Sequence, residues 1–375
     1  MAESYIPETT DVICTLMQKG PNKIGLGERT SYVAHTAKTS PLLNEFDKKI
    51  SESFQCKNAS KFWGGLQTLC LGIAIGALVV LAVAGTVLTG GAAAVFLVAI
   101  GATLLTSAAS GAIGIYKTIH DCDVTKDSQW SMLHGTVKID GGKAVLNQSF
   151  ISCSKGGKVT IIVDPVIAKS AAEQIINNNE NEVAAHMTSQ FVMGLITGAT
   201  SASPAALAVA SPLAIYSYND AENTEQEQRK NNQGRDSFGK QAGDAGKDEL
   251  RDTGLGLPGD FIEGAAESTA INQAAQREAI ELAEQAAARE AAGDLAGAAN
   301  ARIAQGIASR VYHTPWKGML KGLGIGLAGG IVNFGLDQWS NSYEDKMHKG
   351  STDVAKYADE TSDLNNNIGI IATTP

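Results

Sequence analysis

Residues 61–117 read KFWGGLQTLCLGIAIGALVVLAVAGTVLTGGAAAVFLVAIGATLLTSAASGAIGIYK, with no charged side chain between the two terminal lysines. A helix that spans a bilayer needs about 20 apolar residues. The stretch is long enough for two such helices with a Thr-Gly-Gly break at 89–91, and Trp63 and Tyr116 stand where interface aromatics belong. We predict a transmembrane hairpin over residues 62–116. A hairpin buried in a large soluble core is the alternative.

The composition narrows the range of functions. The chain has 375 residues, which is room for two or three domains, and its net charge of −9 argues against a nucleic-acid partner. Residues 1–11 carry three acidic side chains and no apolar run, so we expect no secretory signal there. The sequence contains no GxSxG, HExxH or GxxxxGK[ST] motif, and no catalytic residue is predicted.

Two further apolar blocks follow the hairpin. Residues 184–219 lack Asp, Glu, Lys and Arg and are interrupted by Pro204 and Pro212. This pattern is compatible with three structures: a broken hairpin, one tilted membrane span, or a helix held by the first hairpin. Residues 322–336 form an apolar block that is short for a membrane-spanning helix, and they predict a buried or interfacial helix. The glycine spacing there resembles a dinucleotide-binding loop, but without a strand–helix–strand context it indicates helix packing.

The polar segments predict three further regions. Residues 223–260 are polar and glycine-rich, a composition that cannot bury enough surface to fold alone and that predicts a flexible linker. Residues 263–340 are predicted to be a helical C-terminal region, because alanine, glutamate, glutamine and arginine are strong helix formers. A Gly-Asp pair at 293–294 would divide it into a two-helix spacer or packing hairpin. Residues 341–375 are predicted to be a polar tail.

Short β-strands are indicated on both sides of the first hairpin. Residues 4–15 are strand-like, and residues 135–165 contain alternating apolar runs separated by glycine turns at 140–142 and 156–157. Along the last run, Val159, Ile161 and Val163 fall on one face. The predicted fold class is therefore α+β. A small β-rich domain made of residues 1–60 and 120–165 is split by the hydrophobic hairpin and followed by mostly helical, membrane-active and Ala-rich segments.

One short motif surrounds each of four cysteines. The motifs are Tyr5-Ile6-Pro7 with Cys14-Thr15; Phe54, Cys56 and Asn58; Cys122, Thr125 and Trp130; and Cys153 followed by Gly156-Gly157 and a strand. In this order they resemble the PAAR-like, four-cysteine proteins that form the spike tips of contractile injection machines. The resemblance covers residues 1–60 and 120–165. The chain departs from the family pattern at Thr9-Thr10, at Lys57–Ala59 and at Lys155.

The resemblance implies a function and its partners. It implies a small conical domain that caps a trimeric, VgrG-like spike protein in a type VI secretion system of a Gram-negative cell. Such a protein is made in the cytoplasm, exported by the contractile apparatus and associated with the membrane of a target cell. A chaperone for the hydrophobic segments and an immunity protein are further implied partners. A multi-pass membrane channel or scaffold, and a tip-linked toxin with an unrecognised enzymatic C-terminal domain, are the alternatives.

The resemblance also singles out a set of metal ligands. Cys14, Cys56, Cys122 and Cys153 match the four family positions, whereas Cys70 lies inside the hydrophobic stretch. Four thiolates around Zn²⁺ give a closed structural site with no open position for catalysis. We predict these four cysteines as structural zinc ligands. Disulfides and plain buried thiols are the alternatives, and the candidate substitute ligands are His35, His120 and His134.

Overall fold

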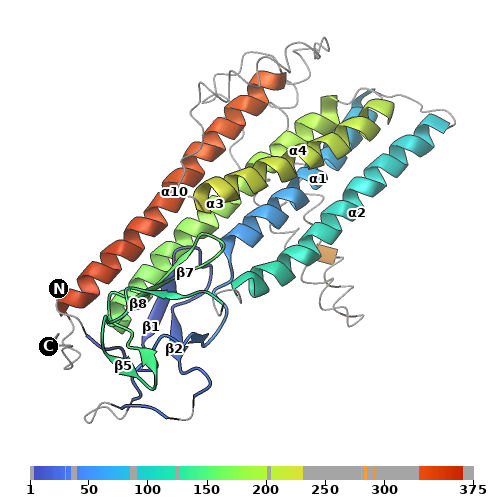
Figure 1. Ribbon diagram of the computed structural model, residues 1–375. Helices are drawn as coiled ribbons and strands as arrows, with labels where there is room; N and C mark the ends of the chain where they lie inside the picture. The colour runs from blue at the N-terminus through green and yellow to red at the C-terminus, as the bar shows by residue number, and fades with distance from the viewer. Residues whose placement is uncertain are drawn as a thin grey trace.

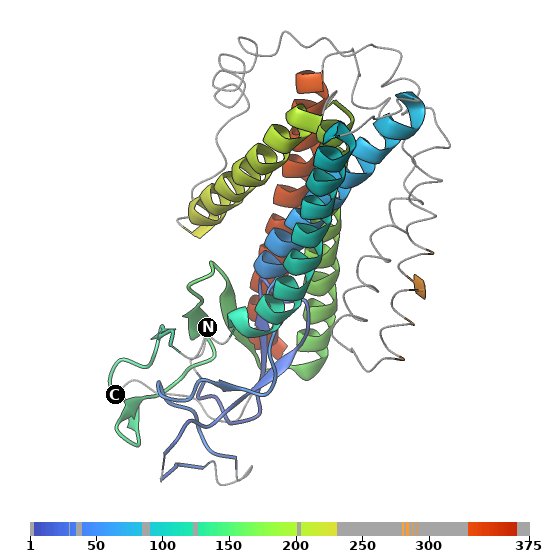
Figure 2. The same cartoon turned by 90° about the vertical axis from the view of Figure 1, so that its right-hand side faces the viewer.

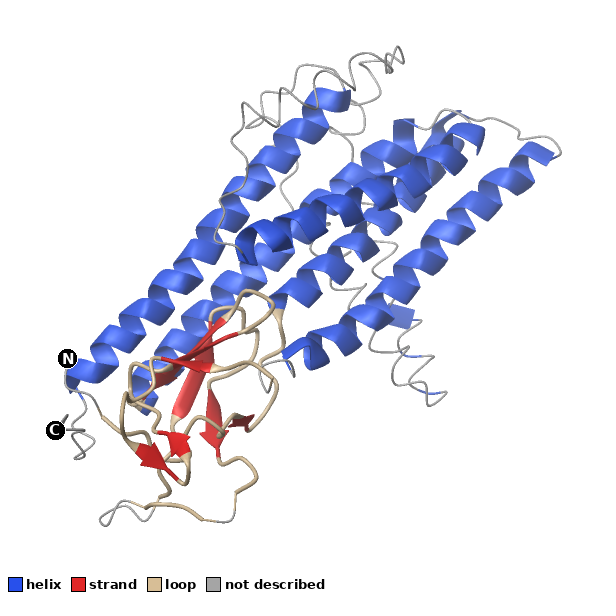
Figure 3. Ribbon diagram, in the orientation of Figure 1, coloured by secondary structure: helices blue, strands red, loops and turns tan. Residues whose placement is uncertain are grey.

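A small β domain lies at one end of a set of long helices, as Figures 1 and 3 show, which confirms the α+β class. The structure is a computed structural model. It describes residues 4–29, 31–34, 40–84, 91–122, 127–200, 204–230 and 329–365, together with five separate helical positions between 280 and 291. Within the helices, the side chains of 78–100, 200, 204–206, 329–339 and 363–365 are not described.

The β domain is built on an antiparallel sheet with the strand order β3-β2-β1-β8-β7-β4, next to a separate β5–β6 hairpin. The strands are β1 (Asp11–Cys14), β2 (Asn22–Gly25), β3 (Lys49–Ile50), β4 (Trp130–Ser131), β5 (Lys138–Ile139), β6 (Gly142–Lys143), β7 (Phe150–Ser152) and β8 (Lys158–Ile162). The β5–β6 turn holds Asp140 and Gly141 at φ values of 49° and 80°, the conformation that Asp-Gly hairpin turns require.

Strands from both sides of the first helical hairpin belong to the same sheet. β1 pairs with β8 from Asp11 opposite Ile162 to Cys14 opposite Val159. Two isolated bridges, Tyr5 with Leu146 and Asn44 with Ala144, join the same two parts of the chain. The chain therefore leaves the β domain before the hairpin and returns to it afterwards.

The helices are α1 (Lys57–Ala84), α2 (Gly91–His120), α3 (Pro165–Thr200), α4 (Pro204–Lys230) and α10 (Gly329–Asn365). The two ends of the α1–α2 hairpin lie together, because the Cys56 amide donates to the Thr118 carbonyl at 3.0 Å. Asp164 caps α3 by accepting from the amide of Val166 at 2.8 Å, and proline at the first helical position suits this start. α10 lies along α3, and α4 returns from the far end of α3 (Figures 1 and 2).

Glycines bring α1 and α3 into backbone contact. Gly72 and Gly76 of α1 face the α3 backbone, and Gly194 and Gly198 of α3 face the α1 backbone. A Cβ atom on any of the four would overlap a carbonyl oxygen of the opposite helix. Each helix thus carries a Gly-x-x-x-Gly pair, the spacing that allows close packing of helices.

The helices differ from the sequence-based bounds in several places. α1 begins before residue 62, α2 extends past 116, and α3 begins at Pro165, well before the predicted block at 184–219. That block is divided between α3 and α4, with 201–203 outside the described residues. Among the described residues, no helix combines the length and the apolar character needed to cross a membrane.

Two polar segments turn out to be helical. The linker prediction is wrong for 223–230, which form the end of α4, because Glu225 and Arg229 pair with each other and with charges on other helices. Residues 341–365 of the predicted polar tail belong to α10. The rest of the predicted linker (231–260) and tail (366–375) lies outside the described residues, as does most of 263–340, including its predicted break at 293–294.

α10 packs through small and polar side chains, which explains why its apolar pattern is weak. The Ser351 hydroxyl donates to the Asn179 side chain of α3 at 3.0 Å, and the Ser362 hydroxyl accepts from the amide of Val163 at 2.9 Å. Ala355 and Ala358 of α10 join the core of the β domain. Because α3 and α10 cover the sheet, Thr160 and Ile162 of β8 are buried as well, and the simple alternation predicted for this strand does not hold.

Candidate functional site

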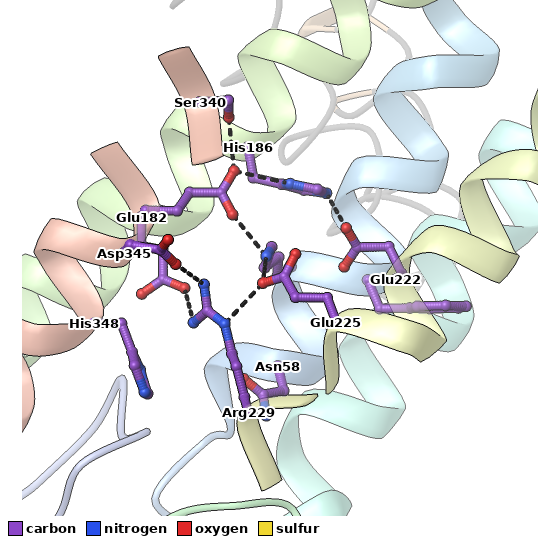
Figure 4. Close-up of polar contacts among 12 residues, drawn as sticks. Asn58, Glu182, His186, Glu222, Glu225, Arg229, Ser340, Asp345 and His348 are labelled. Carbon is purple, nitrogen blue, oxygen red and sulfur yellow. Dashed lines mark hydrogen bonds and ion pairs between the residues drawn. The ribbon is translucent and has the colours of Figure 1, made fainter. Parts of the chain in front are cut away.

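A charged cluster lies buried where α1, α3, α4 and α10 meet near the β domain (Figure 4). We define it as Lys57, Lys61, Glu182, His186, Glu222, Glu225, Arg229 and Glu344. The Lys57 ammonium lies 2.5 Å from Glu182, and both side chains are fully buried. The Lys61 ammonium lies 2.5 Å from Glu225 and 2.6 Å from Glu344. Two lysines of α1 thus hold carboxylates of three other helices.

A second layer of contacts closes the charged cluster. The Arg229 guanidinium lies 2.8 Å from Glu182, which therefore serves two cations. The His186 ring lies between two carboxylates, with Nδ1 3.1 Å from Glu344 and Nε2 3.4 Å from Glu222. The Ser340 hydroxyl donates to Glu344 at 2.6 Å. α10 is therefore tied to helices from the first half of the chain.

Burial and neighbouring charges set the ionisation of the cluster. Burial lowers the pKa of Lys57, the largest effect there, although Glu182 works against it. Burial alone would raise the pKa of Glu182, but Lys57, Arg229 and Lys61 together hold it below its usual value. Burial alone would lower the pKa of Lys61, but Glu222, Glu344 and Glu225 raise it. Burial raises the pKa of Glu222, so this acid is easier to protonate than Glu182, whose pKa is lowered.

This arrangement suits an element that fixes how the helices pack. Buried ion pairs give little net stability over apolar packing, but losing one partner leaves a buried charge at high cost. The cluster therefore favours one register of α1, α3, α4 and α10 over others. The sequence analysis missed it. The available signal was the four-residue spacing of Lys57 with Lys61, Glu182 with His186, and Glu225 with Arg229.

The four predicted zinc ligands lie in the part of the β domain that is next to α1 and α2. Cys14 ends β1, Cys56 directly precedes α1, Cys122 follows α2, and Cys153 follows β7. The first three lie in the core of the β domain, and a hydrogen bond joins the sulfurs of Cys56 and Cys122. Cys70 is buried elsewhere, in the helical core with Leu66, Leu69 and Tyr218.

The thiols differ in their ionisation. The pKa of Cys56 is lowered to about 7, first because Cys122 donates a hydrogen bond to its sulfur, and further because the amides of Asn58 and Ala59 donate to it at the start of α1. Burial raises the pKa of Cys14 and of Cys153. Donation to Cys56 raises the pKa of Cys122. Cys56 is therefore the sulfur of the group that is most readily a thiolate.

The donor atoms suit structural zinc in kind. Converging cysteine sulfurs with amide donors are typical ligands of closed zinc sites. The Lys155 amide donates to the Cys153 sulfur at 3.4 Å, in addition to the amides that serve Cys56. Across the described ranges, no three or more His, Cys, Asp or Glu side chains are grouped as a metal-binding set. The zinc site stays a prediction, in which these four cysteines would hold the ion.

The other motif residues support the β domain. The Trp130 indole donates to the Asp47 carbonyl at 3.0 Å, and the side-chain amide of Asn58 donates to the Lys155 carbonyl at 3.0 Å. Among the substitute ligands, His134 is buried with Nδ1 accepting from the amides of Thr136 and Val137. His120 lies exposed at the end of α2 against the ring of Tyr116. His35 and Thr125 lie outside the described residues.

No protein-family model, curated protein or solved structure matches the chain. The likeness to PAAR-like proteins rests on the four cysteine motifs.

If the four cysteines hold one zinc ion, replacing any of them by serine will destabilise the β domain by a similar large amount, because binding energy at such a site is folding energy. Cys70→Ser is the matched control, since this cysteine lies in the helical core. Thermal unfolding of the reduced protein and elemental analysis of the same samples check the prediction. Absence of stoichiometric zinc from the reduced wild-type protein would contradict it.

Proposed function

We propose that this chain is a spike-tip protein of a type VI secretion system. Its β domain caps a trimeric, VgrG-like spike, and its hydrophobic helices are delivered into or across a target membrane. The order of the four cysteine motifs supports the tip assignment. Cys56 and Cys122 stand at the two ends of the α1–α2 hairpin and share a hydrogen bond, which is consistent with a hairpin inserted into a tip.

The observation that carries the membrane part of this proposal is the outer face of α2 and α4. Large apolar side chains point away from the protein on both helices. On α2, Leu105 is 74% and Tyr116 is 61% exposed, and on α4, Val209, Leu213 and Tyr216 are between 61% and 70% exposed. Monomeric soluble proteins rarely leave large contiguous apolar patches uncovered, and such patches mark partner or membrane surfaces.

The same faces require a cover before delivery. We propose a dedicated chaperone with a hydrophobic groove, which would bind these helices in the producing cell and keep them out of its own membranes. The chain expressed alone will aggregate or enter membranes, and co-expression with the chaperone will make it soluble. Replacing 62–116 and 184–219 by flexible linkers will remove the dependence. A full-length chain that stays soluble and monomeric alone would contradict this expectation.

Export is the decisive test of the function. The chain should appear in culture medium only when the contractile sheath of the producing cell is functional, and it should co-purify with the trimeric spike protein. The comparison uses a strain that lacks the sheath and is otherwise identical, with a cytoplasmic protein as the lysis control. Constant residence in the producing cell's membrane, whatever the state of the sheath, would instead favour the channel or scaffold alternative.

A further inference from the structure

The second half of α4 is attached to the other helices by charge. After Tyr218, residues 219–230 contain no apolar side chain larger than that of alanine. Three of their charged side chains pair with residues of other helices: Glu222 with His186 of α3 at 3.4 Å, Glu225 with Lys61 of α1 at 2.5 Å, and Arg229 with Glu182 of α3 at 2.8 Å. Ion pairs change with the protonation of their members, so the attachment of residues 219–230 depends on pH.

The surroundings of His186 require one proton more than a neutral histidine carries. Its ring lies between two carboxylates, with Nδ1 3.1 Å from Glu344 and Nε2 3.4 Å from Glu222 (Figure 4). A neutral imidazole has a single N–H and donates to only one of them. The second contact becomes a hydrogen bond only when a further proton is present, either on the ring or on Glu222.

The charge count of the charged cluster points to the same proton. Its four carboxylates are Glu182, Glu222, Glu225 and Glu344, and its three lysine and arginine cations are Lys57, Lys61 and Arg229. Four negative and three positive charges leave −1, which one proton on His186 or Glu222 balances. Among the described residues, the other three carboxylates each pair with a lysine or an arginine, whereas Glu222 pairs with His186 alone. A buried charge without a partner is costly, so the packed cluster retains this proton.

Glu222 faces ionisable groups from each helix of the charged cluster. These groups are Lys61 of α1, His186 of α3, Tyr218 and Glu225 of α4, and Glu344 of α10. Burial raises the pKa of Glu222, His186 and Lys61 oppose this rise, and Glu225 and Glu344 add to it. The environment of Glu222 as a whole therefore favours its protonated form.

The groups at the edge of the charged cluster do not replace this proton. Asp345 lies 3.4 Å from Arg229 and is half-exposed. His348 Nδ1 lies 3.1 Å from the Lys57 ammonium, and burial together with the Lys57 charge lowers the pKa of His348 to about 3, so this ring is neutral near pH 7. The ionisable side chains of α2, none of which forms an ion pair with Glu222 in the described part of the chain, are Tyr116, Lys117 and His120.

We propose that residues 219–230 form a pH-sensitive latch, which closes onto α1, α3 and α10 with the uptake of one proton by His186 and Glu222, and which opens when that proton is lost. A separated histidine has a pKa of about 6.5 and a separated glutamate one of about 4.3, so near pH 8 the separated pair carries no proton. Closing at that pH binds one, and the closed form is disfavoured by up to about tenfold for each further unit of pH.

The latch controls the position of the rest of α4. Val209, Leu213 and Tyr216, which lie earlier on this helix, are exposed, and the closed latch keeps them fixed beside the other helices. Mildly alkaline solution favours the open form, in which the end of α4 is free of α1 and α3. The inference does not depend on the proposed function, since it concerns the packing of the helices and not their entry into a membrane.

Hydrogen–deuterium exchange of the full chain in mild detergent, at pH 6.5 and pH 8.5, tests the latch. After correction for the intrinsic effect of pH on exchange, the protection of residues 219–230 should be at least about tenfold lower at pH 8.5. The protection of β8 should change by less than about twofold, because the β domain stays folded. Equal protection of residues 219–230 at the two pH values would overturn the proposal. So would a parallel loss of protection in β8, which would mean that the whole fold opens.

Glu222→Gln balances the charged cluster without the additional proton. This variant should keep residues 219–230 protected at pH 8.5 and lose the pH dependence, and combining it with His186→Gln should give the same result. Glu227→Gln changes an exposed glutamate of the same segment and is the matched control, which should respond to pH as the wild type does. A Glu222→Gln protein with the same pH dependence as Glu227→Gln would refute the latch.

Discussion

Replacing Gly72 or Gly194 by alanine will loosen the packing of α1 on α3 and lower the free energy of unfolding by about 3 kcal/mol, the upper range for overpacking a well-filled interior. The added methyl group would overlap the carbonyl oxygen of Phe191 in the first case and of Leu69 in the second. Both obstacles are backbone atoms, so no side chain can rotate away. The two helices must separate along their length.

Gly101 of α2 provides the matched control. A Cβ atom on Gly101 would meet no atom within 4 Å, so Gly101→Ala adds only the helix propensity of alanine, which stabilises by about 1 kcal/mol. Unfolding of the three variants in mild detergent, followed by far-ultraviolet circular dichroism, compares them directly. Equal stability of the Gly72, Gly194 and Gly101 variants would show that α1 and α3 do not pack through their glycines.

Glu182→Gln will destabilise the protein by about 3–5 kcal/mol, the range for removing one partner of a buried ion pair. Glu182 serves Lys57 at 2.5 Å and Arg229 at 2.8 Å, and Lys57 has no exposed surface. The amide keeps the shape of the side chain but leaves a buried ammonium without its countercharge. Because Glu182 carries a lowered pKa, its contribution is present at neutral pH and is lost as the pH falls through that value.

Two further variants separate the ion pair from general effects on α3. Glu180→Gln changes an exposed glutamate one half-turn away and should leave stability within about 0.5 kcal/mol of the wild type. Combining Glu182→Gln with Lys57→Met removes both charges and should recover most of the loss. Urea unfolding at pH 7 measures all of these variants. A Glu182→Gln protein as stable as Glu180→Gln would contradict a structural role for the charged cluster.

Local patterns predicted the local structure well. The uncharged stretch indicated a helical hairpin, and the Asp-Gly pair at 140–141 indicated a turn that the structure contains. These features depend on residues close together in the sequence. The packing of α10 depends instead on residues of distant helices. Its buried stripe is made of small and polar side chains, namely Ser340, Glu344, Ser351, Ala355, Ala358 and Ser362. Side chains of this kind look exposed until the partner helix is known.

The candidate site divides in the same way. The grouping of Cys14 with Cys56 and Cys122 followed from motifs that were already associated with one domain. No known motif indicates the charged cluster. Lys57 reaches Glu182, and Lys61 reaches Glu344, only after four helices have assembled. Charges at helical spacing usually mark a solvated face. Only their burial in the structure shows that the charges of this cluster are not on a solvated face.

The pairing of β1 with β8 has a consequence for synthesis on the ribosome. Thr15, next to β1, accepts a hydrogen bond from Lys158, a residue 143 positions later in the chain. At the usual pace of about 5–20 residues per second, β1 waits of the order of ten seconds for its partner strand to emerge. Within this interval the whole uncharged stretch, residues 61–117, leaves the ribosome before Lys158 does, so it is outside while the sheet is still incomplete. A protecting factor that waited for the finished fold would arrive too late, so protection has to begin on the nascent chain.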